Sequence, residues 1–410
     1  MNKLILLISS LYLLVSSAFG QSTFPLFRDS ALQSNRLTIS GNLDLTGTSM
    51  RKEFVNTLLF GGYVNSEMKD RTLKSHRANN RLGIFASGDI SYVAGASNLF
   101  KSGKYSWLVK AGYYVTGNIN YTKDAFKLTF YGNSYLGAAD TANLTGTRIA
   151  GMQFQKAGFG FYHKKTGSSL TLNLVNVQNQ YGGYIRNGKW YQGADADTLN
   201  LRLNGDMTYS SGNNFSKGIG FAVDFDFYLK VPWLKDSATF QFTVQNLGAA
   251  YMFKSQTSYF ADSTYRYNGF TLDQIKHSGN LFGDHFSLLD SLNVQKKEVK
   301  RWVIVPAFIQ ISKLVDLQSA KKLQSFFGIR FYPTIGIVPT GFAGLFYRFV
   351  PRVSASANVA FGGSSIVRGG LMFGYHGDQL GVQLGTDDIY GLVSKKGFGQ
   401  SALIRLSWLL

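Results

Sequence analysis

Long segments of this chain alternate apolar and polar residues at every second position. In residues 218–231, one face is apolar from Ile219 to Leu229, and the other carries Asp224, Asp226 and Lys230. Alternation with a period of two is the pattern of a β-strand between two different surroundings. Similar segments recur at residues 126–131, 199–208, 238–245, 326–332, 353–361, 380–387 and 401–410. The chain is therefore expected to be all-β.

The length of these segments separates two all-β architectures. Strands of a soluble β-sandwich usually have about 5–6 residues, whereas these segments run to roughly 9–14, enough to cross a bilayer at a tilt. The 45 Gly, 33 Phe, 23 Tyr and only 6 Pro, with a mean hydropathy of −0.05, agree with a wall that alternates lipid-facing and lumen-facing residues. We predict one transmembrane antiparallel outer-membrane β-barrel over residues 21–410.

The first twenty residues have the layout of a secretory signal peptide. Lys3 is followed by an apolar run over residues 4–15 and by the small-x-small site Ala18-Phe19-Gly20, which predicts a mature start at Gln21. The run is shorter than the roughly 20 residues of a spanning helix, which disfavours a membrane anchor. Export through a cleaved signal predicts residence in the outer membrane. The sequence has no cysteine, which excludes disulfides and thiolate metal sites.

The alternating segments give a strand number and one long connection. An even number is expected when both ends of a barrel are periplasmic, so we predict 14 strands, with 16 as the alternative. The first segment, residues 36–47, is alternatively a plug inside the barrel. Residues 251–300 are the longest connection, and we expect them to be an extracellular loop that folds over the mouth or contacts a partner.

Tryptophans and charges fall at positions that a barrel would use. Five tryptophans lie near predicted strand ends, as an interfacial aromatic belt requires: Trp107, Trp190, Trp233, Trp302 and Trp408. The alternation predicts nine lumen-facing charges: Lys127, Arg202, Asp206, Asp224, Asp226, Lys230, Arg330, Arg348 and Arg405. Their mixed signs favour internal ion pairs over a constriction that selects solutes by charge, but both interpretations stay open.

The sequence offers no catalytic, metal or cofactor signature. Its densest group of histidines, His277 and His285 with Asp284, matches neither a metal site nor a catalytic triad in spacing. We expect no enzyme activity and no cofactor. The net charge of +19 is scattered over turns and alternate positions, which disfavours nucleic acid as a partner. It favours outer-membrane lipid phosphate or an anionic solute.

Three short stretches resemble a known family. They are Gln245-Asn246-Leu247-Gly248 at a strand end, Tyr267-Asn268-Gly269-Phe270 in the long connection, and the segment LGTDDIYG at 384–391. On these motifs the chain resembles an uncharacterised outer-membrane barrel family of Bacteroidota, a domain of unknown function. That family is more distantly similar to the PorP/SprF-type barrels associated with type IX secretion, and it commonly has Asp where this chain has Asn246. The resemblance implies the fold and the location, and the family has no settled activity to lend.

Two hypotheses for function follow. The first is a non-enzymatic subunit or scaffold of a secretion or assembly complex in the cell envelope, with other envelope proteins as partners. The resemblance and the long aromatic connection motivate it. The alternative is a passive channel or transporter for small, anionic solutes, motivated by the basic charge balance and the polar lumen face.

Overall fold

The computed structural model describes Phe24 and residues 32–99, 103–137, 139–193, 198–210, 212, 214–233, 236–267, 295–333 and 336–410. Its strands are β1 (Asn35–Gly47), β2 (Asn79–Ala94), β3 (Tyr105–Thr122), β4 (Thr141–Asn143), β5 (Arg148–His163), β6 (Ser169–Gln192), β7 (Leu199–Ser210), β8 (Gly218–Trp233), β9 (Asp236–Tyr267), β10 (Gln295–Ile304), β11 (Phe308–Lys313), β12 (Leu323–Phe331), β13 (Val338–Val350), β14 (Val353–Gly363), β15 (Val367–His376), β16 (Leu380–Thr386) and β17 (Gly399–Leu409). Its helices are α2 (Lys52–Phe60), α3 (Ser66–Leu73), α4 (Lys123–Tyr131), the 3₁₀ turn η1 (Asn133–Tyr135) and α7 (Ile389–Val393). None of the described helices is long and apolar enough to span a membrane.

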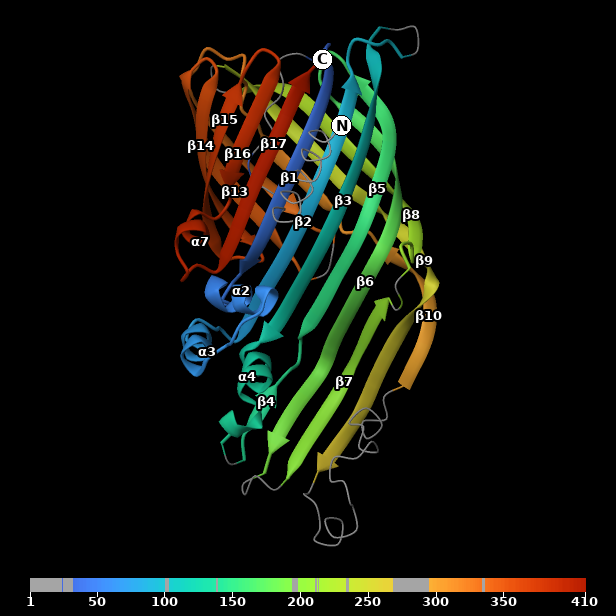
Figure 1. Cartoon of the computed structure of the whole chain (residues 1–410), viewed down its shortest axis with the longest axis vertical. Coiled ribbons are helices and arrows are strands. Elements are labelled where there is room, and N and C mark those ends of the chain that lie inside the picture. The colour runs from blue at the N-terminus through green and yellow to red at the C-terminus, as the bar shows by residue number, and fades with distance from the viewer. Residues whose placement is uncertain are drawn as a thin grey trace, which may run out of the picture.

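One antiparallel sheet closes on itself to form a barrel (Figure 1). The ring is completed by β1 and β17, which pair from Arg36 opposite Leu409 to Thr46 opposite Gly399. β1 also pairs with β2 along its whole length, and β17 pairs with β16. The prediction of a closed β-barrel is confirmed. The alternative of a plug at residues 36–47 is wrong, because this segment is a strand of the wall.

The pairing gives fourteen positions around the ring. The described residues form seventeen strands, and β4 has three residues and pairs only with β6. β7 and β8 lie end to end along β6, and β10 and β11 lie end to end along β9. Sixteen segments without β4 therefore close the ring, which agrees with the alternative number of 16. Because two pairs of them lie end to end, they occupy fourteen positions around the ring, the number predicted first.

The outer face of the wall is apolar and exposed. Along β6, Leu170, Leu172 and Leu174 are 40, 66 and 53 % exposed, whereas the intervening Thr171 and Asn173 are buried. The same alternation occurs on the other side of the ring, where Phe361 on β14 and Phe373 on β15 are exposed. A soluble barrel would bury these side chains, so this outer face is the lipid-facing surface of a transmembrane barrel.

Aromatic residues lie toward both ends of the apolar surface. Trp408 is 54 % exposed at the end that holds the described termini, where Trp107 also stacks on Phe159 at 6.4 Å. Trp302 is 66 % exposed on β10 and packs against Tyr251 at 5.5 Å. The other two predicted belt residues differ: Trp190 is half-buried near the end of β6, and the side chain of Trp233 lies outside the described residues.

The two ends of the barrel differ. Short turns join the strands at the end near the termini, whereas helices α2, α3, α4 and α7 lie at the opposite end (Figure 1). Short periplasmic turns and longer extracellular connections are typical of outer-membrane barrels, so we assign the helical end to the extracellular side. Strands β6, β7 and β9 extend further toward the helical end than the shorter strands on the opposite side of the barrel (Figure 1). Where this extension begins, Lys217 donates to Asn179 at 2.6 Å, and Asn179 donates to Gln153 at 2.7 Å.

Both ends of the predicted loop at 251–300 form β-strands. Residues 251–267 continue β9, which pairs with β7 and with β10, and residues 295–300 belong to β10. The prediction was wrong here because polar residues on both faces hide the alternation of a strand that leaves the bilayer. The remaining part, residues 268–294, lies outside the described residues, together with His277, Asp284 and His285.

The lipid-facing assignment predicts a depth-dependent cost of charge. Leu174→Arg, near the middle of the apolar surface, should lower the free energy of unfolding by about 2–4 kcal/mol, because a guanidinium enters the bilayer. Leu323→Arg, at the end of β12 near the membrane surface, should cost about 0–1 kcal/mol. The measurement is denaturant unfolding in lipid vesicles, and equal costs at both positions would contradict the assignment.

Candidate functional site

A chamber of about 570 Å³ lies inside the barrel toward the helical end. The phase of β5 shows which side chains face it: Met152, Phe154 and Lys156 are buried inside the wall, so Arg148 and Ala150 on the same face also point inward. The same reasoning on the other strands gives the inward-facing lining residues Asp44, Phe85, Asn118, Tyr184, Asp206, Thr340 and Arg368.

The charges that line the chamber are unequally paired. Arg368 donates to Asp44 at 2.6 Å across the interior, and Asp206 forms an ion pair with Arg186. Arg148 has neither an ion pair nor a side-chain hydrogen bond with any described residue, and its guanidinium stacks over the ring of Tyr184 at 4.3 Å. One guanidinium of the chamber therefore keeps its hydrogen-bonding positions open.

The hairpin between β12 and β13 reaches across the lumen. Asn120 on β3, on the opposite side of the ring, donates its Nδ2 to the carbonyl of Gly336 at 2.9 Å. Gly336 has a φ of +95°, which glycine adopts without steric cost. A Cβ at this position would also contact Arg148 and Asn118. The hairpin thus narrows the extracellular half of the barrel beside the chamber.

A buried apolar layer lies next to the chamber, toward the periplasmic end. Met152 and Phe154 from β5 pack with Val175 and Val177 from β6, and with Met252 from β9. All are fully buried or nearly so. On the opposite wall, a second interior cluster includes Phe326 and Phe346, and Phe24 packs against Phe326 with ring centroids 6.2 Å apart. Phe24 is therefore inside the barrel, as an N-terminal plug segment would be.

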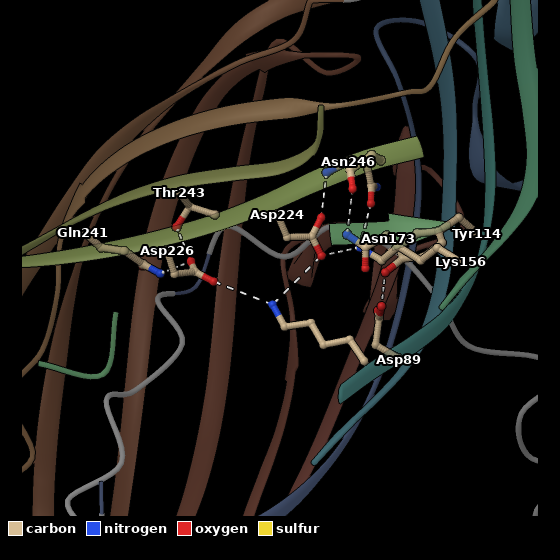
Figure 2. A network of polar contacts seen from close by, with 11 residues as sticks. Asp89, Tyr114, Lys156, Asn173, Asp224, Asp226, Gln241, Thr243 and Asn246 are labelled. Atoms are coloured by element: carbon tan, nitrogen blue, oxygen red, sulfur yellow. Dashed lines mark hydrogen bonds and ion pairs between the residues drawn. The ribbon is translucent and has the colours of Figure 1, made fainter. Parts of the chain in front are cut away.

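A buried network of charges follows the apolar layer (Figure 2). The Lys156 ammonium, 1 % exposed, donates to Asp224 Oδ2 and to Asn246 Oδ1, both at 2.7 Å. The backbone N–H of Asn246 donates to Asp224 Oδ1 at 2.9 Å. Each member therefore satisfies another, which a buried ion pair requires if it is to persist.

The network depends on a bulge in β9. The register with β8 shifts between Val223 and Phe225, and Asn246 has a φ of +60° there. Asparagine tolerates this left-handed conformation better than most residues, and the bulge aims its side chain at Lys156. The stretch Gln245–Gly248 that carries part of the family resemblance forms this bulge.

Further polar side chains contact the acidic residues of this region. Lys110 lies 3.9 Å from Asp224 and 4.0 Å from Asp226. Asp226 accepts hydrogen bonds from Gln241 at 2.9 Å and from Thr243 at 2.8 Å. The interior at this level is filled with protein side chains along β5, β6, β8 and β9, so a solute in the chamber meets a packed layer before the periplasmic end.

A helical cap stands at the extracellular rim. Phe54 of α2 and Phe126 of α4 pack with Tyr121 at the end of β3. His76 lies among them, with Nδ1 2.8 Å from the carbonyl of Thr72 and Nε2 3.1 Å from the Tyr121 hydroxyl. Burial lowers the pKa of His76, so at neutral pH it is uncharged, donates from Nδ1 and accepts at Nε2. The cap fixes the end of β3, which carries Asn118 and Asn120.

The structure places the predicted lumen charges in several environments. Asp224 belongs to the buried network, Asp226 lies among the polar side chains around it, and Asp206 lines the chamber. Arg330 is buried and donates to Gln310 at 2.6 and 2.8 Å. Arg348 donates to the carbonyls of Leu317 and Ser319, at 2.5 and 3.1 Å, beside the turn at the periplasmic end.

The remaining predicted charges differ from one another. Arg405 pairs in register with Ser40 of β1, and Arg202 and Lys230 lie on exposed parts of β7 and β8. The prediction for Lys127 is wrong. Residues 126–131 belong to α4, whose N-terminus is capped by Thr122, and the Lys127 ammonium lies over the ring of Tyr135 at 4.7 Å. Six alternating residues were too short a segment to distinguish a strand from a helix.

Sequence reasoning missed the residues that define the site: Lys156, Arg148, Asn118, Asp44 and Arg368. The phase of β5 was a usable signal for the first two, because Arg148 and Lys156 share the face of Met152 and Phe154. Their partners come from other strands, and no local pattern links them. Among the described residues, no group of three or more His, Asp or Glu side chains is arranged to hold a metal ion.

The buried network predicts a paired mutational response. Lys156→Met should lower the free energy of unfolding by about 3–5 kcal/mol, because it leaves Asp224 charged and buried. Adding Asp224→Asn should recover most of the loss, since the neutral amide retains an acceptor for the N–H of Asn246. Denaturant unfolding of both variants in lipid vesicles measures this, and additive losses would argue against the pairing.

Comparisons with known proteins give structural similarity only. No protein-family model and no curated protein matches the chain. It is similar in structure to the Pseudomonas putida toluene transporter TodX, with a TM-score of 0.38 and 10 % identity over 92 % of this chain and 90 % of that one. For a TodX deletion mutant described as a monoaromatic hydrocarbon channel, the TM-score is 0.41 and the identity 9 %, over 97 % of this chain and 98 % of that one. For the translocator domain of the Neisseria meningitidis autotransporter NalP, the TM-score is 0.30 and the identity 9 %, over 92 % of this chain and 88 % of that one. Identities and TM-scores this low transfer no substrate or partner to this chain.

Proposed function

We propose that this protein is an outer-membrane barrel that admits small solutes through its interior. The chamber of about 570 Å³ carries the proposal, because its volume falls in the range of small-molecule sites and its lining combines aromatic, amide and charged side chains. The lining residues come from β1, β2, β3, β5, β6, β7, β10, β13, β14 and β15, so the chamber is central to the ring.

The outer-membrane location is supported by three features. The lipid-facing side chains are apolar and exposed, aromatic residues lie toward both ends of this surface, and the first twenty residues have a signal-peptide pattern. Because both walls bury interior side chains between the chamber and the periplasmic end, passage requires these layers to rearrange. The proposed transport is therefore gated and slower than through an open, water-filled porin.

Solute uptake into liposomes tests the proposal. Purified protein should admit small polar solutes faster than protein-free liposomes do. Ala150→Trp, which fills the chamber, should slow uptake about fivefold or more. Ala157→Trp, on the same strand but facing lipid, is the matched control and should change the rate by less than about twofold. No uptake above protein-free liposomes, or equal effects of the two variants, would contradict the proposal.

A second candidate function is that of a subunit in a cell-envelope complex. β10 pairs with β9 on one edge, and no described strand pairs with its other edge. Almost every side chain of β10 is exposed, and Lys296, Lys297 and Lys300 make it strongly basic. An open basic strand edge on the extracellular side fits an acidic extended segment of another envelope protein, added as a further strand.

Capture from native outer membranes tests this second function. The tagged protein, extracted in mild detergent, should retain a stoichiometric partner. Lys296→Glu, Lys297→Glu and Lys300→Glu combined should remove it, because the charge of the edge is reversed. Lys321→Glu with Lys322→Glu, at the opposite end of the barrel, is the control. A barrel that is recovered alone, or a partner that survives the reversal at β10, would count against a role as a complex subunit.

A further inference from the structure

We propose that the chamber contains a selective binding site for the carboxylate of a small organic acid, centred on Arg148. This inference rests on the proposed solute-admitting function and names its substrate class. The site consists of the Arg148 guanidinium, the amides of Asn118 and Asn120, and the aromatic face of Tyr184.

Arg148 is prepared to bind an oxyanion. Its guanidinium stacks on Tyr184 at 4.3 Å, which fixes the plane of the group. The neighbouring Asp206 is neutralised by Arg186, and Asp44 by Arg368. No carboxylate among the described residues pairs with Arg148. A planar guanidinium held in this way presents two parallel N–H donors, which match the two oxygens of a carboxylate.

The amides beside Arg148 have open hydrogen-bonding positions. Asn118 is 5 % exposed, yet neither its Oδ1 nor its Nδ2 has a partner. Asn120 uses Nδ2 on the Gly336 carbonyl, and its buried Oδ1 has no partner. Asn118 lines the chamber, and Asn120 lies beside it, opposite Arg148. Buried polar groups are nearly always satisfied in folded proteins, so unsatisfied ones at a chamber point to a ligand that completes them.

Both amides lie beside Arg148 in the fold. Asn120 is directly opposite Arg148 in the β3–β5 register, and Asn118 is opposite Ala150. A Cβ placed on Gly336 would contact all three side chains, which confirms that they converge on one point of the lumen.

The charge and shape of the site select among anions. One guanidinium without a partner balances one negative charge, which suits a carboxylate better than a phosphate of charge −1.5 to −2. Phe85, Tyr184 and Tyr332 give the chamber aromatic surface for an apolar or aromatic body. The inferred ligand is therefore a monocarboxylate with a compact apolar part.

Calorimetric titration of the purified barrel tests the inference, with benzoate as the probe. Benzamide, its neutral isostere, and phenyl phosphate are the comparison ligands. Benzoate should bind, and the other two should bind at least about tenfold more weakly. Arg148→Gln and Arg148→Lys should each weaken benzoate binding about tenfold or more, the second because it keeps the charge but loses the planar fork. Asn118→Leu should also weaken it.

Arg202→Gln is the control, because it removes an exposed guanidinium on β7 that does not line the chamber, and it should leave affinity within about twofold. Heat-dependent gel mobility confirms that each variant remains a folded barrel. Equal binding of benzoate and benzamide, no benzoate binding, or unchanged binding by folded Arg148→Lys would overturn the inference. If liposomes still admit neutral solutes in that case, the proposed function stands without this substrate class. Absence of all uptake would refute the function itself.

Discussion

The obligation to pair every backbone N–H and C=O inside a bilayer governs this structure. A sheet with free edges in lipid would leave those groups without partners, at a cost of several kcal/mol each. The register of β1 with β17 removes both edges, from Arg36 opposite Leu409 to Thr46 opposite Gly399. Once the ring is closed, alternate side chains must point either to lipid or to the interior. That choice produces the apolar outer face and gathers the polar residues inside.

Polar side chains in the interior then need hydrogen-bond and charge partners from one another, and the interior is arranged in layers. The ammonium of Lys156 is neutralised by Asp224 and completed by Asn246, whose left-handed backbone exists because β9 bulges at that point. The apolar layer of Met152 and Phe154 separates this network from the chamber. In the chamber, Arg148 and Asn118 keep open hydrogen-bonding positions.

The fold followed from the sequence to a large extent because its signal is local. Strands such as β8 and β17 alternate without interruption, and their length alone distinguishes a membrane wall from a soluble sheet. The prediction of secondary structure was wrong where the apolar-polar alternation was weak or short. The part of β9 after Tyr251 has polar residues on both sides and looked like a loop, and α4 looked like a strand over six residues.

The site was beyond sequence reasoning for a different reason. Arg148, Asn118 and Arg368 come from three strands, and the distance between them depends on the register and curvature of the whole ring. Alternation predicts which side of the wall a residue faces, but it does not predict which residue stands across the lumen. Asp224 was therefore predicted as an inward charge, whereas its partner Lys156, sixty-eight positions earlier, was not.

The unequal height of the wall has a consequence for how molecules reach the interior. β10 continues to Gln295 on one side, whereas β12 ends at Phe331, opposite Ile309 of β11. The extracellular rim of the barrel is therefore oblique, and strands β6, β7 and β9 form its taller side (Figure 1). On the low side of this rim, the inner faces of the tall strands stand above the level at which the shorter strands end. The opening of the barrel therefore faces partly sideways, along the membrane surface, as well as outward.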